Sequence, residues 1–368
     1  MGFFRICTAA GLLCLYAAAA SLPAPNHQLL DNQAIDALIE AGHWKGAQQA
    51  AEARLKSDPN DAQAHARLSK IESSFSDLDG SIAEAERAVE LDPHVAAFHG
   101  QLAEANALMA DHSSVLKGLI YARRMKKEIA AALAIDPNHV DTLLVQMMYE
   151  WKAPAMAGGD RSQAWQIAAH IAQVSPAWGY LARARLFQDE GNDKEVEAAL
   201  QKAIEADPSS YRARVALARF YCCTAKQRRY AKAEQIAREA IALDPSEAGG
   251  WEILARIYAA QRRGGQLNET LAQAEAASPD DLAPYYAAAS VLFETGQDFP
   301  HAEQYLRRYL SQPTEGREAT QAEACWLMAE LYEREGRKSD ALRELQAAIR
   351  LDPAFEQARR DLNRLRHS

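Results

Sequence analysis

Three arginines recur at a regular distance along the chain, each directly after an alanine. They are Arg185, Arg219 and Arg256, which lie 34 and 37 residues apart. A guanidinium group presents its N–H donors in a planar fork, a geometry that suits carboxylates through paired hydrogen bonds. If the three side chains lie in one row, they indicate a site for carboxylates or for an acidic extended peptide.

The same arginines have acidic neighbours. Asp189, Glu190 and Glu252 are close enough in sequence to form ion pairs with them on neighbouring helical turns. Isolated surface arginines usually pair in this way, and such pairing would leave a neutralised wall in place of a binding site. The sequence leaves both interpretations open.

Motifs typical of catalysis are not found. The chain has no His-Glu-x-x-His zinc motif, no Gly-x-Ser-x-Gly nucleophile turn, no phosphate-binding Gly-x4-Gly-Lys-Ser/Thr loop and no dinucleotide-binding fingerprint. The histidines are dispersed, and most are expected at helix starts or on polar faces, in solvated or capping roles. We therefore expect a protein that is not an enzyme and that holds no metal or cofactor.

The cysteines do not form the pattern of a disulfide framework. Cys7 and Cys14 lie in the apolar N-terminal stretch, which leaves Cys222, Cys223 and Cys325. Disulfide-rich domains have an even number of spaced cysteines, and here the number is odd and two are adjacent. Because free cysteine is commonly buried, we expect these three to be small apolar packing residues.

Composition favours packed helices. Hydrophobic residues make up 48% of the chain and aromatic residues only 8%, while alanine is frequent and runs of Val, Ile and Thr are scarce. A length of 368 residues exceeds one compact core and suggests two domains or an elongated repeat array. The net charge of −9 argues against nucleic-acid binding, which requires a basic face.

The N-terminus has the features of an export signal. Arg5 precedes an uncharged apolar stretch, Ile6 to Ala20, which ends in three alanines before Ser21. Cleavage after Ala20 would remove residues 1–20, and residues 21–33 would form a flexible leader. We expect an exported protein, periplasmic or secreted.

The alternative is an uncleaved N-terminal membrane anchor. A bilayer span needs about 20 apolar residues, and this stretch is shorter. We therefore expect no stable membrane insertion once the signal has been removed.

A proline recurs at the end of each expected helical segment, usually after aspartate. Proline cannot donate to the helical ladder and disfavours a helical residue before it, so it ends one helix and starts the next at its first turn. Successive pairs are 34, 44, 39, 32, 37, 34, 34 and 40 residues apart. They are Asp58-Pro59, Asp92-Pro93, Asp136-Pro137, Ser175-Pro176, Asp207-Pro208, Asp244-Pro245, Ser278-Pro279, Gln312-Pro313 and Asp352-Pro353.

This spacing resembles the period of the tetratricopeptide repeat, about 34 residues. The side chains also resemble the family, most clearly where Trp251, Leu254 and Tyr258 share one helical stripe with the small Ala255. Leu267 departs from the alanine usual at its position, so we expect a looser helix contact there.

The resemblance covers residues 34–353 as about eight to nine units, some of them irregular, and is to a repeat protein of exported bacterial type. It implies an all-α fold, a right-handed superhelical solenoid of antiparallel helix pairs. Residues 354–368 are expected to form a C-terminal capping helix.

The fourth unit carries an inserted loop. Pro154 ends its first helix, Gly158 and Gly159 permit the turn, and Asp160 can cap the next helix. The loop is similar to one in some bacterial envelope repeat proteins, including helical components associated with solute transporters. It is either a long capped turn or a loop that contacts a ligand through Trp151, Gly158, Gly159 and Asp160.

The resemblance implies that the first helix of each unit lines a concave groove and that Arg185, Arg219 and Arg256 face into it. We expect a non-enzymatic exported scaffold that binds a protein or an extended peptide segment, acidic in character. The alternative is a ligand-binding accessory protein of an envelope solute transport system. A closed cavity beside Trp151 and Trp178 would favour the accessory protein, and an open groove the scaffold.

Overall fold

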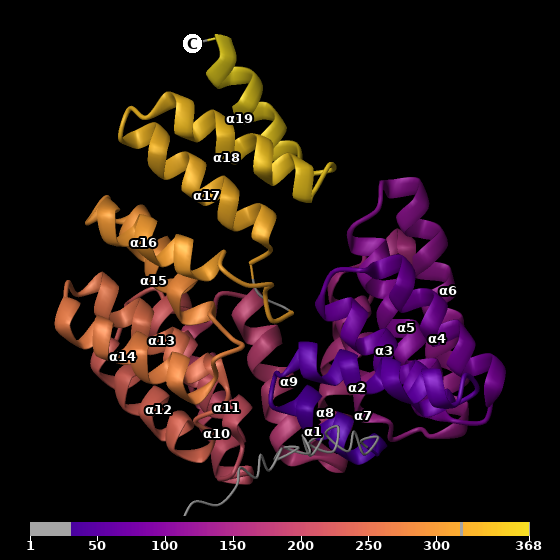
Figure 1. Cartoon of the computed structure of the whole chain (residues 1–368). Helices are drawn as coiled ribbons and strands as arrows, with labels where there is room; N and C mark the ends of the chain where they lie inside the picture. The colour runs from indigo at the N-terminus through magenta and orange to yellow at the C-terminus, as the bar shows by residue number, and fades with distance from the viewer. Residues whose placement is uncertain (1–30, 317–318, 368) are drawn as a thin grey trace, which may run out of the picture.

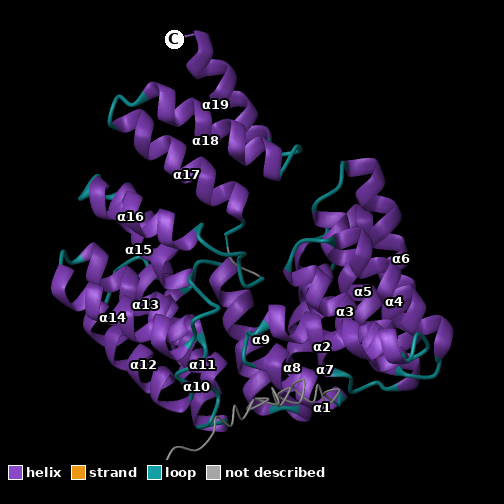
Figure 2. Cartoon of the chain, viewed as in Figure 1, coloured by secondary structure: helices purple, strands orange, loops and turns teal. Residues whose placement is uncertain are grey.

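The computed structural model describes residues 31–316 and 319–367. Within these ranges the chain consists of helices and connecting loops and contains no strand (Figure 2). The prediction of an all-α solenoid is confirmed. The expected export signal, residues 1–20, and most of the expected leader, residues 21–30, lie outside the described residues.

The described helices form nine successive pairs followed by one further helix (Figure 1). The first helices are α1 (Asn32–Glu40), α3 (Ala62–Ser74), α5 (Ala96–Asp111), α7 (Val140–Lys152), α9 (Pro176–Asp189), α11 (Tyr211–Arg219), α13 (Ala248–Ala260), α15 (Ala283–Glu294) and α17 (Gln321–Arg334). The second helices are α2 (Trp44–Ser57), α4 (Leu78–Leu91), α6 (Val115–Ile135), α8 (Arg161–Val174), α10 (Asp193–Ala206), α12 (Tyr230–Leu243), α14 (Gly264–Ala277), α16 (Phe299–Tyr309) and α18 (Lys338–Leu351). The last helix is α19 (Glu356–His367).

Small residues lie where neighbouring helices cross. Ala85, Ala218, Ala255 and Ala341 have no exposed surface. Helices α8 and α9 approach closely, since a Cβ added at Gly179 would stand 2.3 Å from the Cα of Ala172. Packed helix axes are about 8–10 Å apart, and only small side chains allow the lower end of that range.

The aspartate of each Asp-Pro pair makes the turn into the next helix. Its Oδ1 accepts the backbone N–H two residues further on at 2.8–3.0 Å, so one carboxylate closes the turn while proline stops the preceding helix. The six aspartates are Asp58, Asp92, Asp136, Asp207, Asp244 and Asp352. Hydrogen bonds from the Ser209 hydroxyl and N–H hold the pKa of Asp207 below its usual range.

The residue six positions after the proline often fastens the same turn. A side-chain nitrogen contacts the proline carbonyl in the pairs His65 with Pro59, His99 with Pro93, Trp251 with Pro245 and Arg359 with Pro353. His99 is also buried, and its Nδ1 lies 2.7 Å from Oε2 of the buried Glu128. His99 is therefore an exception to the solvated or capping roles expected for most of the histidines.

Cys222 and Cys223 also differ from expectation. They form a disulfide between adjacent residues in a π-helical turn, η2 (Phe220–Thr224), which continues α11. The prediction of unpaired packing cysteines is wrong for this pair, although Cys222 is buried. Cys325 is free and buried, and burial raises the pKa of its thiol to about 11.

Three junctions between successive pairs share one arrangement, which we call the Glu-Tyr-Arg cluster. A glutamate on the second helix of one pair accepts hydrogen bonds from a tyrosine hydroxyl (2.6–2.9 Å) and an arginine (2.6–2.7 Å) of the next pair. The guanidinium lies over the tyrosine ring, 4.0–4.4 Å from its centroid. The clusters are Glu197–Tyr221–Arg229, Glu234–Tyr258–Arg263 and Glu303–Tyr332–Arg337.

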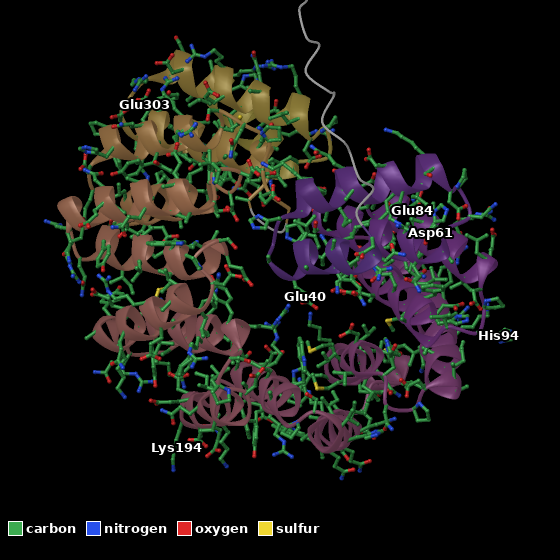
Figure 3. The ribbon with its side chains drawn as sticks, turned by 60° about the horizontal axis from the view of Figure 1, so that its bottom comes forward. Glu40, Asp61, Glu84, His94, Lys194 and Glu303 are labelled. Atoms are coloured by element: carbon green, nitrogen blue, oxygen red, sulfur yellow. A yellow bond between two sulfur atoms is a disulfide. The ribbon has the colours of Figure 1, made fainter. Side chains whose placement is uncertain are left out.

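The curve of the array brings its beginning against a loop near its end (Figures 1 and 3). The ammonium of Lys45, on α2, donates to the carbonyls of Asp280 and Pro313 at 2.8 and 3.0 Å and forms an ion pair with Glu315 at 3.1 Å. Glu315 Oε1 accepts the backbone N–H of Lys45 at 2.9 Å, and the glutamate is only 3% exposed. A residue 270 positions away therefore caps the N-terminus of α2, whose own His43 makes no side-chain cap bond.

The first prediction concerns Glu303 and acid. Burial raises its pKa, but hydrogen bonds from Arg337, Arg307 and Tyr332 outweigh burial and hold the pKa at about 2, below its ordinary 4.5. A folded-state pKa below the unfolded value stabilises the fold above about pH 4.5, and this contribution is lost as pH falls towards 2. Glu303→Gln should therefore cost about 1–3 kcal/mol at pH 7, because charged hydrogen bonds are lost.

Thermal unfolding of wild type and Glu303→Gln between pH 7 and pH 2 tests this. The gap between their midpoints should shrink as pH falls, whereas the exposed control Glu205→Gln should unfold like wild type throughout. A gap that stays constant over the whole pH range would contradict the assignment.

The second prediction concerns the contact between Lys45 and Glu315. Lys45→Met leaves a buried carboxylate without its cation, a change that costs about 3–5 kcal/mol in buried pairs. We expect the contact to separate, with a larger radius of gyration in small-angle X-ray scattering. Replacing both partners, as Lys45→Met with Glu315→Leu, should recover part of the compactness.

The control is Lys56→Met, which changes an exposed lysine on the same helix. Identical scattering from all variants would show that the contact does not keep the two ends of the curve together.

Candidate partner-binding surface

The first helices line the inner side of the curve. They pack on one another from pair to pair, as α3 does with α5, α13 with α15 and α15 with α17. Figure 3 shows Lys194 and Glu303, on the second helices α10 and α16, at the outside of the curve. The inner side of a curved array has the shorter circumference, so the helices that contact one another there are the first helices.

The three predicted arginines occupy one equivalent position on consecutive first helices. Arg185 lies on α9, Arg219 ends α11 and Arg256 lies on α13, each after a buried alanine. Their side chains are 51%, 47% and 26% exposed. We call this row the arginine ladder.

The arginines of the ladder have acidic partners. Arg219 donates to Glu252 Oε2 at 3.0 Å and Arg256 donates to Oε1 of the same glutamate at 3.1 Å. Arg185 lies 3.8 Å from Asp189, beyond ordinary hydrogen-bond length. The local pairing considered from the sequence is thus present for all three arginines, with direct hydrogen bonds for Arg219 and Arg256 and a longer ion pair for Arg185. These pairs join three guanidinium groups to two carboxylates, Asp189 and Glu252, and the side chains of Arg185 and Arg219 are about half exposed.

Two further residues join this surface that the sequence analysis did not place in the ladder. Trp178 and Arg212 each lie seven residues before a ladder arginine, two helical turns earlier on the same face. The Arg212 guanidinium lies over the Trp178 ring, 5.1 Å from its centroid. The seven-residue spacing was the signal that would have identified them. They extend the surface with a fourth cation and an aromatic ring.

The inserted loop lies between α7 and α8 and includes a short 3-10 helix, η1 (Ala155–Ala157). Asp160 caps α8 by accepting the N–H groups of Ser162 and Gln163 at 2.8 and 3.3 Å. Gly158 has φ +90°, and a Cβ at Gly159 would lie 2.0 Å from the carbonyl oxygen of Ala153. Both glycines are therefore required by the backbone.

The helix that precedes the loop, α7, contacts the arginine ladder. Trp151 Nε1 donates to Asp189 Oδ2 at 3.0 Å, and Asp189 is the partner of Arg185. The other face of the loop forms a hollow of about 600 Å³ beside Trp151, where the Arg161 guanidinium lies 4.7 Å from an indole ring centre. Most side chains around the hollow are exposed and Trp178 does not line it, so the closed cavity beside both tryptophans is not formed.

Two negative observations hold for the described part of the chain. No group of three or more His, Cys, Asp or Glu side chains is arranged to hold a metal ion. Within the same residues, every helix is too short or too polar to span a bilayer. The arginine ladder with Trp178 and Arg212 presents hydrogen-bond donors, cations and an aromatic ring, a combination that suits recognition of carboxylates.

Comparison with known proteins gives a family signal for two parts of the array. Residues 179–210 and 322–355 match the tetratricopeptide repeat family model. No curated protein sequence matches the chain.

Solved structures are similar at low sequence identity. A thermophilic TPR protein of Thermus thermophilus is 20% identical with a TM-score of 0.45, over 51% of this chain and 95% of its own. Yeast Tom70 is 13% identical with a TM-score of 0.49, over 91% and 87%. Pseudomonas aeruginosa PilF is 19% identical with a TM-score of 0.39, over 61% and 97%.

Proposed function

We propose that the chain is a non-catalytic scaffold that binds an extended acidic segment of a partner protein on the inner side of its helical array. Tetratricopeptide repeats are in general protein-interaction modules, and their stacked units create extended concave surfaces. The observation that carries the acidic specificity is the ladder itself, in which three arginines at one repeat position share two carboxylates, Asp189 and Glu252, among the described residues.

The spacing of the ladder suits an extended peptide. Packed helices are about 8–10 Å apart, and an extended chain advances about 3.3–3.6 Å per residue. Every third residue of such a peptide would therefore meet the next first helix, and a segment of about seven to nine residues would pass Arg185, Arg219 and Arg256. A partner carboxylate beside Arg219 takes over the donors that Glu252 does not occupy.

The ring stacking at Trp178 supports the same role. Arg212 is exposed, and its guanidinium lies over the indole ring. Such contacts contribute about 0.5–1 kcal/mol at exposed sites and orient the cation. The pair adds a flat contact area at the end of the ladder nearest to α9.

A second candidate is a ligand-binding accessory protein of an envelope transport system. The observation that favours it is the hollow beside Trp151, where Lys152 and Arg161 lie with Glu150 and Asp160. A small ligand bound there would touch the loop alone, because the lining residues all lie between Glu150 and Arg161. The scaffold has the larger surface and is our first proposal.

Export is part of the proposal. The short apolar stretch, Ile6 to Ala20, and the three alanines before Ser21 support removal of residues 1–20 and a periplasmic or secreted location.

The third prediction tests the ladder. Changing Arg185, Arg219 and Arg256 together to Gln should weaken binding of a labelled nine-residue peptide rich in Asp at least tenfold, while the thermal midpoint changes little. Wild-type affinity should also fall as salt rises, because exposed charges are screened over about 10 Å at 0.1 M. Fluorescence anisotropy measures both effects.

A control changes Lys56, Lys194 and Lys202, on second helices, to Gln and removes the same charge. It should keep the wild-type affinity. If the ladder serves only to pair with Glu252 and Asp189, its triple variant will lose thermal stability and keep its affinity, and the proposal is then wrong.

The fourth prediction tests export. N-terminal sequencing of the protein from its producing cell should begin at Ser21 or within a few residues of it. An intact Met1 in the cytoplasmic fraction would count against the location and would leave the peptide-binding proposal unaffected.

A further inference from the structure

The junction between α14 and the next pair lacks the stacked Glu-Tyr-Arg cluster that both neighbouring junctions carry. Here Glu275 accepts hydrogen bonds from Tyr285 and Arg308, at a different position of the junction. Moving 34 residues along from Glu234, Tyr258 and Arg263 leads to the corresponding positions between α14 and the next pair, α15 and α16. These positions hold Asn268, Leu292 and Gln297. All three members are thus replaced together: the anion by an amide, the aromatic ring by a shorter aliphatic chain, and the cation by an amide.

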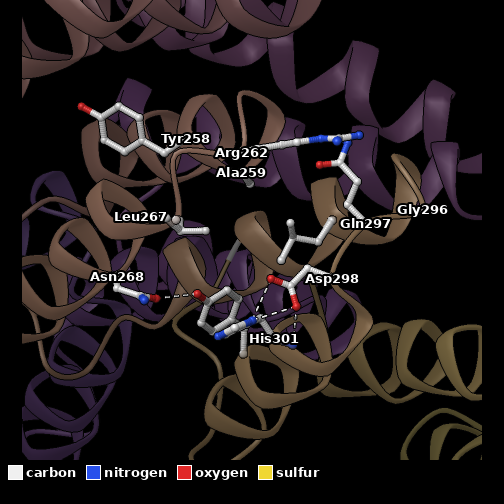
Figure 4. Close-up of a pocket in the computed structure, with 12 residues that line it drawn as sticks. Tyr258, Ala259, Arg262, Leu267, Asn268, Gly296, Gln297, Asp298 and His301 are labelled. Atoms are coloured by element: carbon white, nitrogen blue, oxygen red, sulfur yellow. Dashed lines mark hydrogen bonds and ion pairs between the residues drawn. The ribbon is translucent and has the colours of Figure 1, made fainter.

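The replacement leaves a hollow where the neighbouring junctions are filled. A cavity of about 470 Å³ lies at this junction, and Asn268, Leu292 and Gln297 all line it (Figure 4). This volume falls within the range of about 300–1,000 Å³ that is usual for small-ligand sites. Leu267, which departs from the small residue usual at its position, also lines the cavity.

The inner wall of the hollow is apolar and buried. Leu267 and Leu292 are 3% and 6% exposed, and the rings of Tyr258 and Tyr305 are buried at its sides. The Tyr258 hydroxyl already donates to Glu234, so it presents ring surface to this junction and its hydroxyl to the previous one. A wall of two leucines and two rings suits a flat apolar group.

The polar groups of the hollow are mainly donors. Asn268 Oδ1 accepts the Tyr305 hydroxyl at 2.7 Å, which orients the amide so that its NH₂ group is left for another partner. Arg262 and Gln297 lie together at the rim (Figure 4), and Arg262 forms no ion pair within the described residues. The carboxylate in the hollow, Asp298, is already engaged by His301 at 2.7 Å.

We propose that this hollow is a binding site for an aromatic ring that carries an oxygen acceptor. The ring takes the space that tyrosine fills in the neighbouring junctions, against Leu267 and Leu292. The acceptor oxygen receives an N–H group from Asn268, while Arg262 lies on the opposite side of the hollow (Figure 4). This reverses the polarity of the cluster, where glutamate accepts and tyrosine donates. The site lies beside two turns, the one between α13 and α14 and the one between α15 and α16, and none of the ladder arginines lines it.

Two sources supply this chemistry, and they are separable. One is a tyrosine side chain of a partner protein, and this assignment rests on the scaffold function proposed above. The other is a free aromatic acid, which does not. N-acetyl-L-tyrosinamide stands for the first source and 4-hydroxybenzoate for the second, while N-acetyl-L-leucinamide is an apolar probe without a ring.

The experiment measures binding of the three probes to the full chain, by saturation-transfer NMR and by titration. Wild type should bind at least one of the two aromatic probes and show no transfer to the leucine probe. Binding of the tyrosine probe alone assigns the site to a partner side chain, and binding of 4-hydroxybenzoate alone assigns it to a small molecule. Absence of transfer to both aromatic probes overturns the proposal.

A triple variant that rebuilds the neighbouring cluster is the decisive comparison. Asn268→Glu, Leu292→Tyr and Gln297→Arg should fill the hollow, weaken aromatic binding at least tenfold and raise the thermal midpoint. Wild-type affinity in this variant, once it is shown to be folded, would overturn the site. If the triple variant does not fold, Asn268→Asp keeps the shape of the side chain and replaces the donor by an anion. It should weaken binding of 4-hydroxybenzoate at least tenfold, and unchanged affinity would also overturn the site.

The arginine-ladder variant keeps the two proposals distinct. Changing Arg185, Arg219 and Arg256 to Gln should leave aromatic binding at the wild-type level, because these residues do not line the hollow. Loss of acidic-peptide binding with intact aromatic binding supports both sites. Loss of aromatic binding in this variant would show that the probes bind the ladder and would contradict the assignment to the hollow.

Discussion

At six of the turns that follow a second helix, the carboxylate of an Asp-Pro pair orients the chain for the next helix. Proline stops the second helix, and the aspartate accepts the N–H two residues on, so the backbone leaves the turn in one direction. Six such turns recur with nearly equal distances. Since each unit contacts mainly its neighbours, a constant angle accumulates into a curve, and the curve brings Lys45 to Glu315.

The turns are similar from pair to pair, whereas the side chains at the junctions between successive helix pairs differ. Three of them are closed by a glutamate, a tyrosine and a stacked arginine, and one has Asn268, Leu292 and Gln297 in their place, with a cavity beside them. The first helices α9, α11 and α13 carry an arginine at one repeat position, and Trp151, near the end of α7, donates a hydrogen bond to Asp189 beside Arg185. Function in such an array therefore depends on which side of a unit a residue occupies.

Local features were predictable from the sequence. The prolines, the small residues at helix crossings and the Asp160 cap depend on neighbours within a few positions, so the helix pairs followed from spacing. A repeat-by-repeat alignment would also have shown the cluster and its replacement, because the members are 34 residues apart at the two junctions. Leu267 was noticed as a departure, but the missing ring at Leu292 was not.

Other features depend on geometry that no short stretch contains. The contact of Lys45 with Glu315 joins residues 270 positions apart and requires the sum of the intervening angles. The pairing of the ladder arginines depended on the position of Glu252, whose single carboxylate accepts hydrogen bonds from arginines of two successive units, Arg219 and Arg256. The burial of His99 required Glu128 from the unusually long α6, and the disulfide of Cys222 and Cys223 required the π-helical turn that ends α11.

The central claim is that the partner is bound on the inner side of the array. Site-specific photo-crosslinking tests it most directly, with p-benzoylphenylalanine in place of Gln188, one turn from Arg185 on the same face, or of Lys194, on the outside of the curve. The account predicts a covalent adduct with the acidic peptide from position 188, absent from position 194 and lost at high salt. An adduct of equal yield from position 194, or one that high salt does not reduce, would contradict it.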